Sequence, residues 1–106
     1  SAARLAELRA AGKPVFINMT ADWCITCLAN EQTSLGSDAV KKALIENDIT
    51  YLKGDWTNED PEITEVLEQF NRPSVPLYLL YPSEGEPEIL PQILTQSTLL
   101  EAFGGV

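Results

Sequence analysis

Apolar residues fall at helical spacing in some segments of the chain and at strand-like spacing in others. Leu5 and Leu8 place an apolar stripe on a first helix, which Gly12 would end. The near-continuous apolar run Val15–Thr20 predicts a central strand that is covered on both faces. Helical and strand-like patterns therefore alternate from the start of the chain.

The same pattern continues to the last residues. Asp60-Pro61 supplies a cap residue followed by proline at the first helical position, and an amphipathic helix with apolar residues at i, i+3, i+4 and i+7 follows. The predicted elements in chain order are helix Ala2–Ala11, strand Val15–Thr20, helix Cys24–Leu35 ended by Gly36, a helix from the cap Ser37 to about Glu46, strand Ile49–Lys53, the helix after Asp60, strand Pro76–Tyr81, edge strand Pro87–Leu90 and a final helix capped by Ser97.

This order of elements predicts one α/β domain over residues 1–106. Strands that alternate with helices indicate a parallel core, and the turn Ser83–Glu86 adds an antiparallel edge hairpin. We therefore expect a central sheet that is mixed but mostly parallel, flanked by helices.

Charge and composition exclude several classes of function. The formal net charge of −9 argues against nucleic acid or anionic lipid as a partner, because both require a basic surface. The chain has no histidine, which rules out a histidine-based triad, metal site or pH switch within it. The longest apolar run, Val75–Tyr81, is too short to cross a bilayer.

The candidate chemistry lies in the two cysteines of the chain, Cys24 and Cys27. They are spaced i, i+3 where a predicted strand passes into a predicted helix, which is the arrangement of a dithiol redox centre. The N-terminus of the helix would stabilise a thiolate on the first cysteine. In this interpretation Cys24 is the more exposed nucleophile, and Cys27 is the more buried cysteine that resolves the mixed disulfide.

Two other interpretations of the cysteine pair compete with redox chemistry. A closed zinc site needs four ligands, and the chain offers no further cysteine and no histidine, so we expect no metal. An inert structural disulfide across so short a loop would contribute little stability, because the entropic benefit grows with loop length. We therefore favour a redox-active disulfide that needs no other cofactor.

Trp23 and the pair Val75-Pro76 complete the candidate site. Trp23 either shields one flank of the dithiol and contacts partner chains, or simply covers the end of the sheet. Pro76 opens a predicted strand, where the missing backbone donor restricts it to an end or an edge. An ordinary trans bond is the usual expectation for such a proline.

With Trp-Cys-x-x-Cys, the alternating elements and the strand-opening proline, the chain resembles the thioredoxin superfamily. Five segments narrow the resemblance to the C-terminal periplasmic domain of the DsbD family and to related ScsB-type membrane reductases. These segments are Ala21–Cys24, Asn30–Glu31, Tyr51–Asn58, Asp60–Ile63 and Val75–Tyr78.

The resemblance implies a thioredoxin fold and a place in an exported electron relay. It implies a monomeric periplasmic domain, cut from a larger membrane protein, that takes electrons from a transmembrane domain and passes them to a periplasmic thiol partner. Carried over to this chain, Cys24 attacks, Cys27 resolves and Pro76 is a cis-proline. The Val75 backbone would then be free to pair with an extended substrate strand.

Two polar positions near the dithiol also follow from the resemblance. Glu31 falls where the family has a glutamate close to the active site, and it would tune a thiol or move a proton. The alternative is an ordinary solvated carboxylate. Asn18 falls where many members carry a buried aspartate, and an asparagine cannot titrate. We expect the domain either to work without that acid or to depend on Glu31.

The residues between the cysteines predict the direction of the chemistry. Ile25 and Thr26 carry no charge, so the helix terminus is the main feature that stabilises the thiolate. We therefore expect a reducing potential, nearer to about −270 mV, as in thioredoxin, than to the roughly −120 mV of a strong oxidant. Two other functions stay open: a free-standing thioredoxin-like reductase, and a non-catalytic thiol sensor or metal-binding module.

Overall fold

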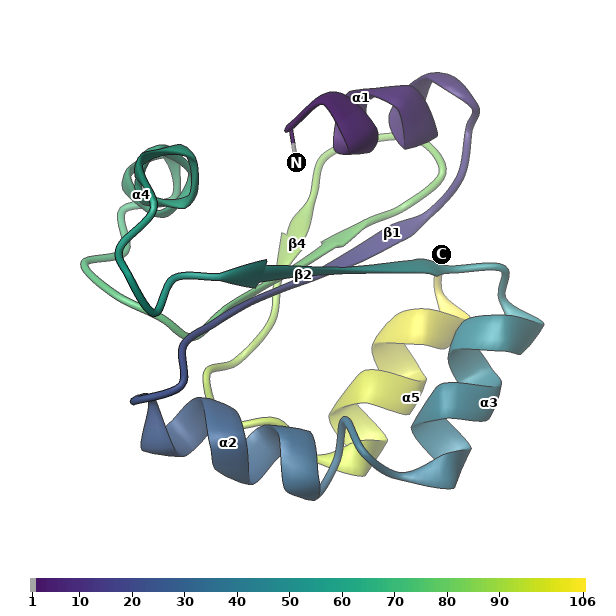
Figure 1. The fold of residues 1–106 in the computed structure, drawn as a ribbon. Helices are drawn as coiled ribbons and strands as arrows, with labels where there is room; N and C mark the ends of the chain where they lie inside the picture. Colours follow the sequence, from purple (N-terminus) through teal and green to yellow (C-terminus); the bar gives the residue numbers. More distant parts are fainter. Residues whose placement is uncertain (1) are drawn as a thin grey trace.

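The computed structural model describes residues 2–106, which form helices on both faces of one sheet (Figure 1). The order of elements agrees with the sequence prediction. In chain order they are α1 (Ala2–Ala10), β1 (Val15–Thr20), α2 (Ile25–Gln32), α3 (Asp38–Glu46), β2 (Thr50–Asp55), α4 (Pro61–Gln69), β3 (Leu77–Tyr81), β4 (Glu88–Ile89) and α5 (Gln96–Gly104).

The sheet is mixed, with the strand order β2-β1-β3-β4. The expectation that it is mostly parallel is wrong, because β1 pairs in parallel with β2 but antiparallel with β3, and β3 pairs antiparallel with β4. The position of α4 explains the difference. This helix lies across the direction of β2 (Figure 1), so the chain re-enters the sheet at the end where β2 left it.

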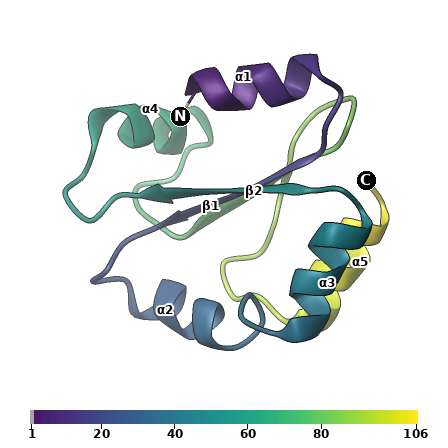
Figure 2. The same cartoon turned by 45° about the vertical axis from the view of Figure 1, so that its right-hand side comes forward.

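The helices divide between the two faces of the sheet. In both views α1 and α4 lie on one face, and α2, α3 and α5 lie on the other (Figures 1 and 2). All six residues of β1 are buried, as predicted for a central strand covered on both sides. Under α1 and α4 the face is apolar and includes Ile17, Met19 and Leu79, with a cavity of about 500 Å³ between these helices and the sheet.

Several predicted element boundaries differ from the structure: β2 extends to Asp55 and not Lys53, and β4 is shorter than Pro87–Leu90. Two further differences, at α2 and α5, have a visible cause. The helix after β1 ends at Gln32 and not near Leu35, because the Leu35 N–H bonds back to the Asn30 carbonyl at 2.9 Å and closes the turn. The cap of α5 is Thr95 and not Ser97: the Thr95 hydroxyl accepts the Thr98 N–H at 3.1 Å, which leaves Ser97 inside the helix. The caps expected at Ser37 and Asp60 are confirmed.

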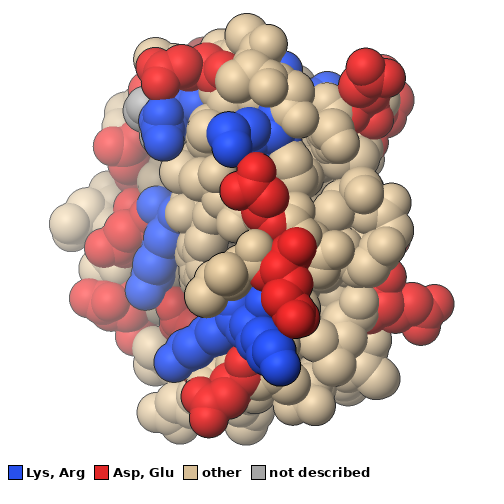
Figure 3. Space-filling model, turned by 90° about the vertical axis from the view of Figure 1, so that its right-hand side faces the viewer, with Lys and Arg blue, Asp and Glu red and all other residues tan. Residues whose placement is uncertain are grey.

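Among residues 2–106, no helix combines the length and apolar character needed to cross a membrane. Figure 3 shows the surface that lies on the right in Figure 1. Acidic and basic side chains are interspersed on this surface.

Candidate active site

Three connecting segments meet at one end of the sheet. The pairing places Thr20, the last residue of β1, opposite Asp55, the last residue of β2. It also places Met19 opposite Leu77, the first residue of β3. The segments that follow β1 and β2 and the segment that precedes β3 therefore converge, and they carry the cysteines, Trp56 and Pro76.

Cys24 and Cys27 form a disulfide at this end, with their Cα atoms 5.2 Å apart. Cys24 is the N-cap of α2, and its sulfur accepts the Cys27 N–H at 3.2 Å. Cys24 retains 7% of its exposure while Cys27 has none. The sequence prediction that Cys24 is the more accessible cysteine is confirmed.

The N-terminus of α2 provides the electrostatic setting for a thiolate. The Cys24 sulfur lies where unpaired N–H groups of the first turn favour negative charge. No acidic residue lies in that first turn to oppose the effect. On reduction, this end of the helix would stabilise a Cys24 thiolate.

Trp23 is held in place by the segment after β2. Its Nε1–H donates to the Thr57 carbonyl at 3.1 Å, and its ring centre lies 5.9 Å from that of Trp56. The Thr57 hydroxyl accepts the Asp22 N–H at 2.9 Å, and Thr57 is itself anchored to the Asp55 carboxylate. The same contacts with Thr57 hold the pKa of Asp55 below its usual value.

Asp55, Trp56 and Thr57, which lie within the segment Tyr51–Asn58, therefore support Trp23. Sequence reasoning did not identify Thr57 as part of the site. A hydroxyl residue two positions after the end of a strand, and two after an aspartate, was the available signal. The apolar side chains of Trp23, Ile25 and Leu28 are exposed around the buried disulfide.

Val75-Pro76 borders the disulfide from the side of β3. The peptide bond between the two residues is cis, as the resemblance implied. Val75 is buried in the same apolar cluster as Cys24 and Cys27, and β3 begins directly after Pro76. The structure thus brings together at one end of the sheet the cysteines, Trp23 and the proline that were predicted from the sequence.

A polar cluster lies on the α2 side of the sheet. Glu31, which is 21% exposed, pairs through Oε1 with Lys53 Nζ at 3.0 Å. Asn18 is fully buried and donates from Nδ2 to the Tyr51 hydroxyl at 2.8 Å and to Glu31 Oε1 at 3.5 Å. The Thr20 hydroxyl donates to Glu31 Oε2 at 3.5 Å. We call these five side chains the Glu31 cluster.

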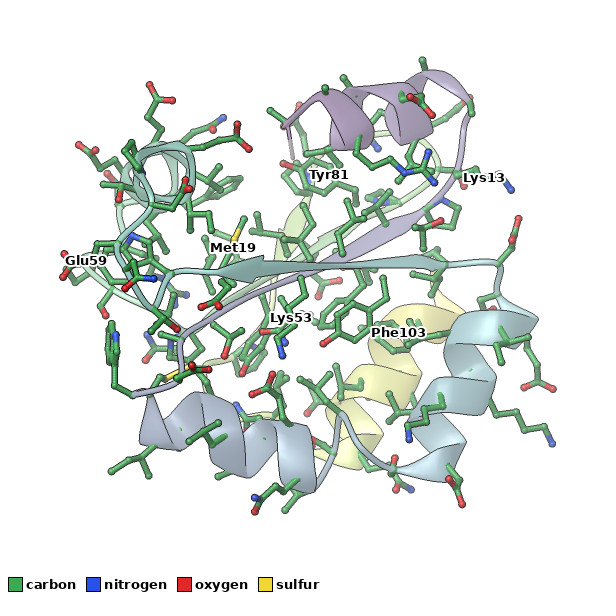
Figure 4. The ribbon with its side chains drawn as sticks, in the orientation of Figure 1. Lys13, Met19, Lys53, Glu59, Tyr81 and Phe103 are labelled. Carbon is green, nitrogen blue, oxygen red and sulfur yellow. A yellow bond between two sulfur atoms is a disulfide. The ribbon has the colours of Figure 1, made fainter. Side chains whose placement is uncertain are left out.

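Lys53 is the charged partner within the Glu31 cluster. Its side chain projects to the side of the sheet that carries α2 (Figure 4). The hydrogen bond to Glu31 raises the pKa of Lys53 above its ordinary value, so the ammonium is retained. Sequence reasoning missed this residue, although strand alternation places Lys53 and Tyr51 on one face of β2.

Asn30, the residue before Glu31, is buried and has a structural task. Its Nδ2 donates to the Tyr78 hydroxyl at 2.8 Å and to the Gln92 carbonyl at 2.9 Å, and its Oδ1 accepts the Leu94 N–H at 3.1 Å. Asn30 therefore fixes the segment before α5 against α2.

Within the described residues, no group of three or more His, Cys, Asp or Glu side chains could hold a metal ion.

Comparison with known proteins agrees with the resemblance to thioredoxin-like and DsbD proteins. A sequence profile of the family described as Thioredoxin-like matches residues 1–83. The chain is 32% identical over 77 residues to the thiol:disulfide interchange protein DsbD of Yersinia pestis, which covers 73% of the chain and 13% of that protein. It is 31% identical over 81 residues to the DsbD of Escherichia coli K12, and this match covers 76% of the chain and 14% of that protein. The chain thus spans about one seventh of the length of these relatives.

Solved structures establish the thioredoxin fold. The oxidised C-terminal domain of DsbD from Neisseria meningitidis superposes with a TM-score of 0.78 at 24% identity, covering 98% of this chain and 93% of that one. A thioredoxin from Thermus thermophilus gives a TM-score of 0.73 at 20% identity, and the match covers 95% of this chain and 78% of that thioredoxin. The predicted fold is confirmed, with the correction to the strand directions given above.

Proposed function

The chain belongs to the thioredoxin-like family, and from that membership we propose that it is a thiol–disulfide oxidoreductase domain that reduces partner disulfides through Cys24 and Cys27. The observation that carries the proposal is a disulfide whose outer sulfur caps a helix N-terminus, with exposed apolar side chains around it. A partner chain can bind those side chains and bring its own disulfide to Cys24.

Reduction of a partner disulfide would proceed in two exchanges. The Cys24 thiolate attacks one partner sulfur, a mixed disulfide forms, and the other partner sulfur leaves as a thiolate that takes up a proton. Cys27 then loses its proton and attacks the Cys24 sulfur, which releases the second partner thiol. Two electrons pass to the partner, and the disulfide seen here is the product.

Val75 and Trp23 would shape the groove that receives the partner. Both lie at the disulfide end of the sheet, on opposite flanks, and Trp23 is exposed. An extended partner segment could pair with the Val75 backbone while its side chains contact Trp23. The redox-active disulfide itself serves as the electron carrier, so the proposal includes no other cofactor.

The finer proposal is that the domain acts in an exported relay. Similarity to DsbD proteins supports a transmembrane domain as the electron donor and a periplasmic thiol protein as the acceptor. In this proposal the domain is monomeric and periplasmic, and it belongs to a larger inner-membrane protein. Its role would be to pass reducing equivalents outward by disulfide exchange.

Single-cysteine variants test the chemistry. Reduced Cys27→Ala, mixed with insulin as a disulfide-bonded substrate, should accumulate a covalent adduct through Cys24 that is visible on a non-reducing gel. Cys24→Ala should accumulate none, because the remaining sulfur is buried. An adduct with Cys24→Ala alone would reverse the two roles, and the absence of any adduct would refute the proposed function.

A separate assay distinguishes the relay from a free-standing reductase. Steady turnover with thioredoxin reductase would favour a free-standing reductase over the relay.

A further inference from the structure

A cavity of about 500 Å³ lies between the sheet, α1 and α4, on the face of the sheet opposite α2. Ile17, Met19 and Leu79 line it from the strands. We propose that this cavity is a binding site for one elongated, uncharged apolar molecule, such as an aliphatic chain of medium length. The site is separate from the dithiol, and the proposal goes beyond the thiol–disulfide chemistry proposed above.

The walls of the cavity are apolar side chains that the fold leaves partly exposed. Leu5 on α1 and both Ile63 and Val66 on α4 line the cavity, and all three are only partly buried. Figure 4 shows Met19 on the α4 side of the sheet and Tyr81 beneath α1. Apolar side chains offer water no hydrogen-bond partner, so moving an apolar molecule from water onto this surface is favourable.

The register of the strands gives the cavity its length. Tyr81 pairs with Val15 at one end of β1, and Gly54 pairs with Met19 near the other end. Both Tyr81 and Gly54 line the cavity. The four residue steps between these pairs span about 13 Å along the strand. An extended chain therefore fits the cavity better than a compact ring.

The two cations that line the cavity are occupied by other contacts. Arg9 donates through both Nη atoms, each at 2.6 Å, to the carbonyls of Pro82 and Gly85. Lys53 projects to the opposite side of the sheet, where its Nζ pairs with Glu31 Oε1 at 3.0 Å. An anionic ligand would have to compete with these contacts for a cation.

The three carboxylates that line the cavity are also engaged. Asp60 caps α4, Glu62 accepts the Ala2 N–H at 3.3 Å, and Asp55 accepts the Thr57 N–H at 2.9 Å. All three carboxylate residues are exposed, and an exposed ion pair with a cationic ligand would contribute little. Recognition therefore depends on apolar contact, which selects an uncharged ligand.

Both helices over the cavity are anchored by contacts outside it. Near the start of α4, the Trp56 Nε1–H donates to the Thr64 hydroxyl at 2.8 Å. Beyond the end of α4, Arg72 Nη1 donates to the Pro76 carbonyl at 3.3 Å. The Arg9 contacts hold α1 to the segment between β3 and β4. These contacts form the cavity before a ligand arrives, which lowers the cost of ordering on binding.

Three eight-carbon probes that differ at one end test the site: 1-octanol, octanoate and octylammonium. Each is titrated into the full chain by isothermal titration calorimetry. We expect 1-octanol to bind saturably, with one molecule per chain, and to shift the methyl resonances of Ile17, Val66 and Leu79. The two charged probes should bind at least about tenfold more weakly, because the cavity offers their charge no unpaired partner.

Variants that fill the cavity from either helix locate the site. Val66→Phe on α4 and Ala6→Leu on α1 should each weaken 1-octanol binding at least about tenfold, because the larger side chain takes the space of the ligand. Ile45→Phe is the matched control: it adds a ring on α3 at a position that is 79% exposed, and it should leave binding unchanged. Thermal unfolding establishes that each variant is folded.

Unchanged affinity for 1-octanol in either folded filling variant would overturn the proposal. So would a charged probe that binds as tightly as 1-octanol, or the absence of saturable 1-octanol binding to the wild type. The titrations involve no disulfide exchange. Their outcome is therefore independent of whether Cys24 and Cys27 act as proposed.

Discussion

Asn30 shows how one buried side chain can hold two segments in place at the active-site end. It is 4% exposed, and its amide bonds the Tyr78 hydroxyl, the Gln92 carbonyl and the Leu94 N–H. Three polar groups from distant parts of the chain are satisfied by this one residue. Truncation leaves the Tyr78 hydroxyl and the Leu94 N–H buried without this partner, which costs more than the loss of a solvent-exposed bond.

We expect Asn30→Ala to lower the free energy of unfolding by about 3 kcal/mol, at about 1 kcal/mol for each lost hydrogen bond. Urea denaturation monitored by tryptophan fluorescence measures this change. Asn47→Ala is the matched control, because Asn47 makes one side-chain bond, to the Ala43 carbonyl at 2.8 Å. Its cost should be about 1 kcal/mol or less. Equal losses in the two variants would contradict the anchoring role of Asn30.

Residues differ in how far the sequence reveals them. Cys24, Cys27 and Trp23 were predicted because their side-chain chemistry and their spacing are local features of the chain. The partnership of Lys53 with Glu31 joins residues of β2 and α2, and it depends on which helix covers which face of the sheet. No local pattern contains that information, so the pair emerges only from the folded structure.

At the scale of elements, Gly36 governs how the chain turns from α2 into α3. A Cβ at this position would lie 2.6 Å from the Glu31 carbonyl oxygen, which is closer than such atoms approach in proteins. The obstacle is backbone and cannot rotate away. The sequence predicted that Gly36 ends the helix, whereas α2 already ends at Gln32 and Gly36 lies in the turn that follows.

We predict that Gly36→Ala destabilises the protein by about 2 kcal/mol, since the turn must shift to relieve the overlap. Gly104→Ala provides the control, because Gly104 lies in α5 with nothing within 4 Å of the added Cβ. Alanine there should be neutral or stabilising by up to about 1 kcal/mol. Thermal unfolding of both variants measures the difference. A Gly36→Ala protein as stable as the wild type would refute the steric argument.

Element boundaries were less predictable than the elements themselves. Both Thr95 and Ser97 carry a hydroxyl that can cap a helix, and the choice between them depends on which residue takes the extended backbone conformation. The strand directions were also mispredicted, because α4 lies across the sheet and returns the chain to the same end. Such features follow from packing between elements, which a single segment does not encode.

At the scale of the whole molecule, the sheet separates two environments. One face, under α1 and α4, is apolar and includes Met19 and Leu79. The other face carries the Glu31 cluster near the dithiol and an apolar core with Phe16 and Phe103 farther along. The dithiol lies where both faces meet the end of the sheet, with the exposed apolar side chains of Trp23, Ile25 and Leu28 near it.

The most direct test of the central claim is a redox titration of the Cys24–Cys27 pair against defined ratios of reduced and oxidised dithiothreitol. Fluorescence reports the transition, because Trp23 directly precedes the disulfide. We predict one two-electron transition at a potential nearer to about −270 mV than to about −120 mV. A potential below about −300 mV, typical of inert structural disulfides, would contradict the redox role, and a value near −120 mV would contradict its reducing direction.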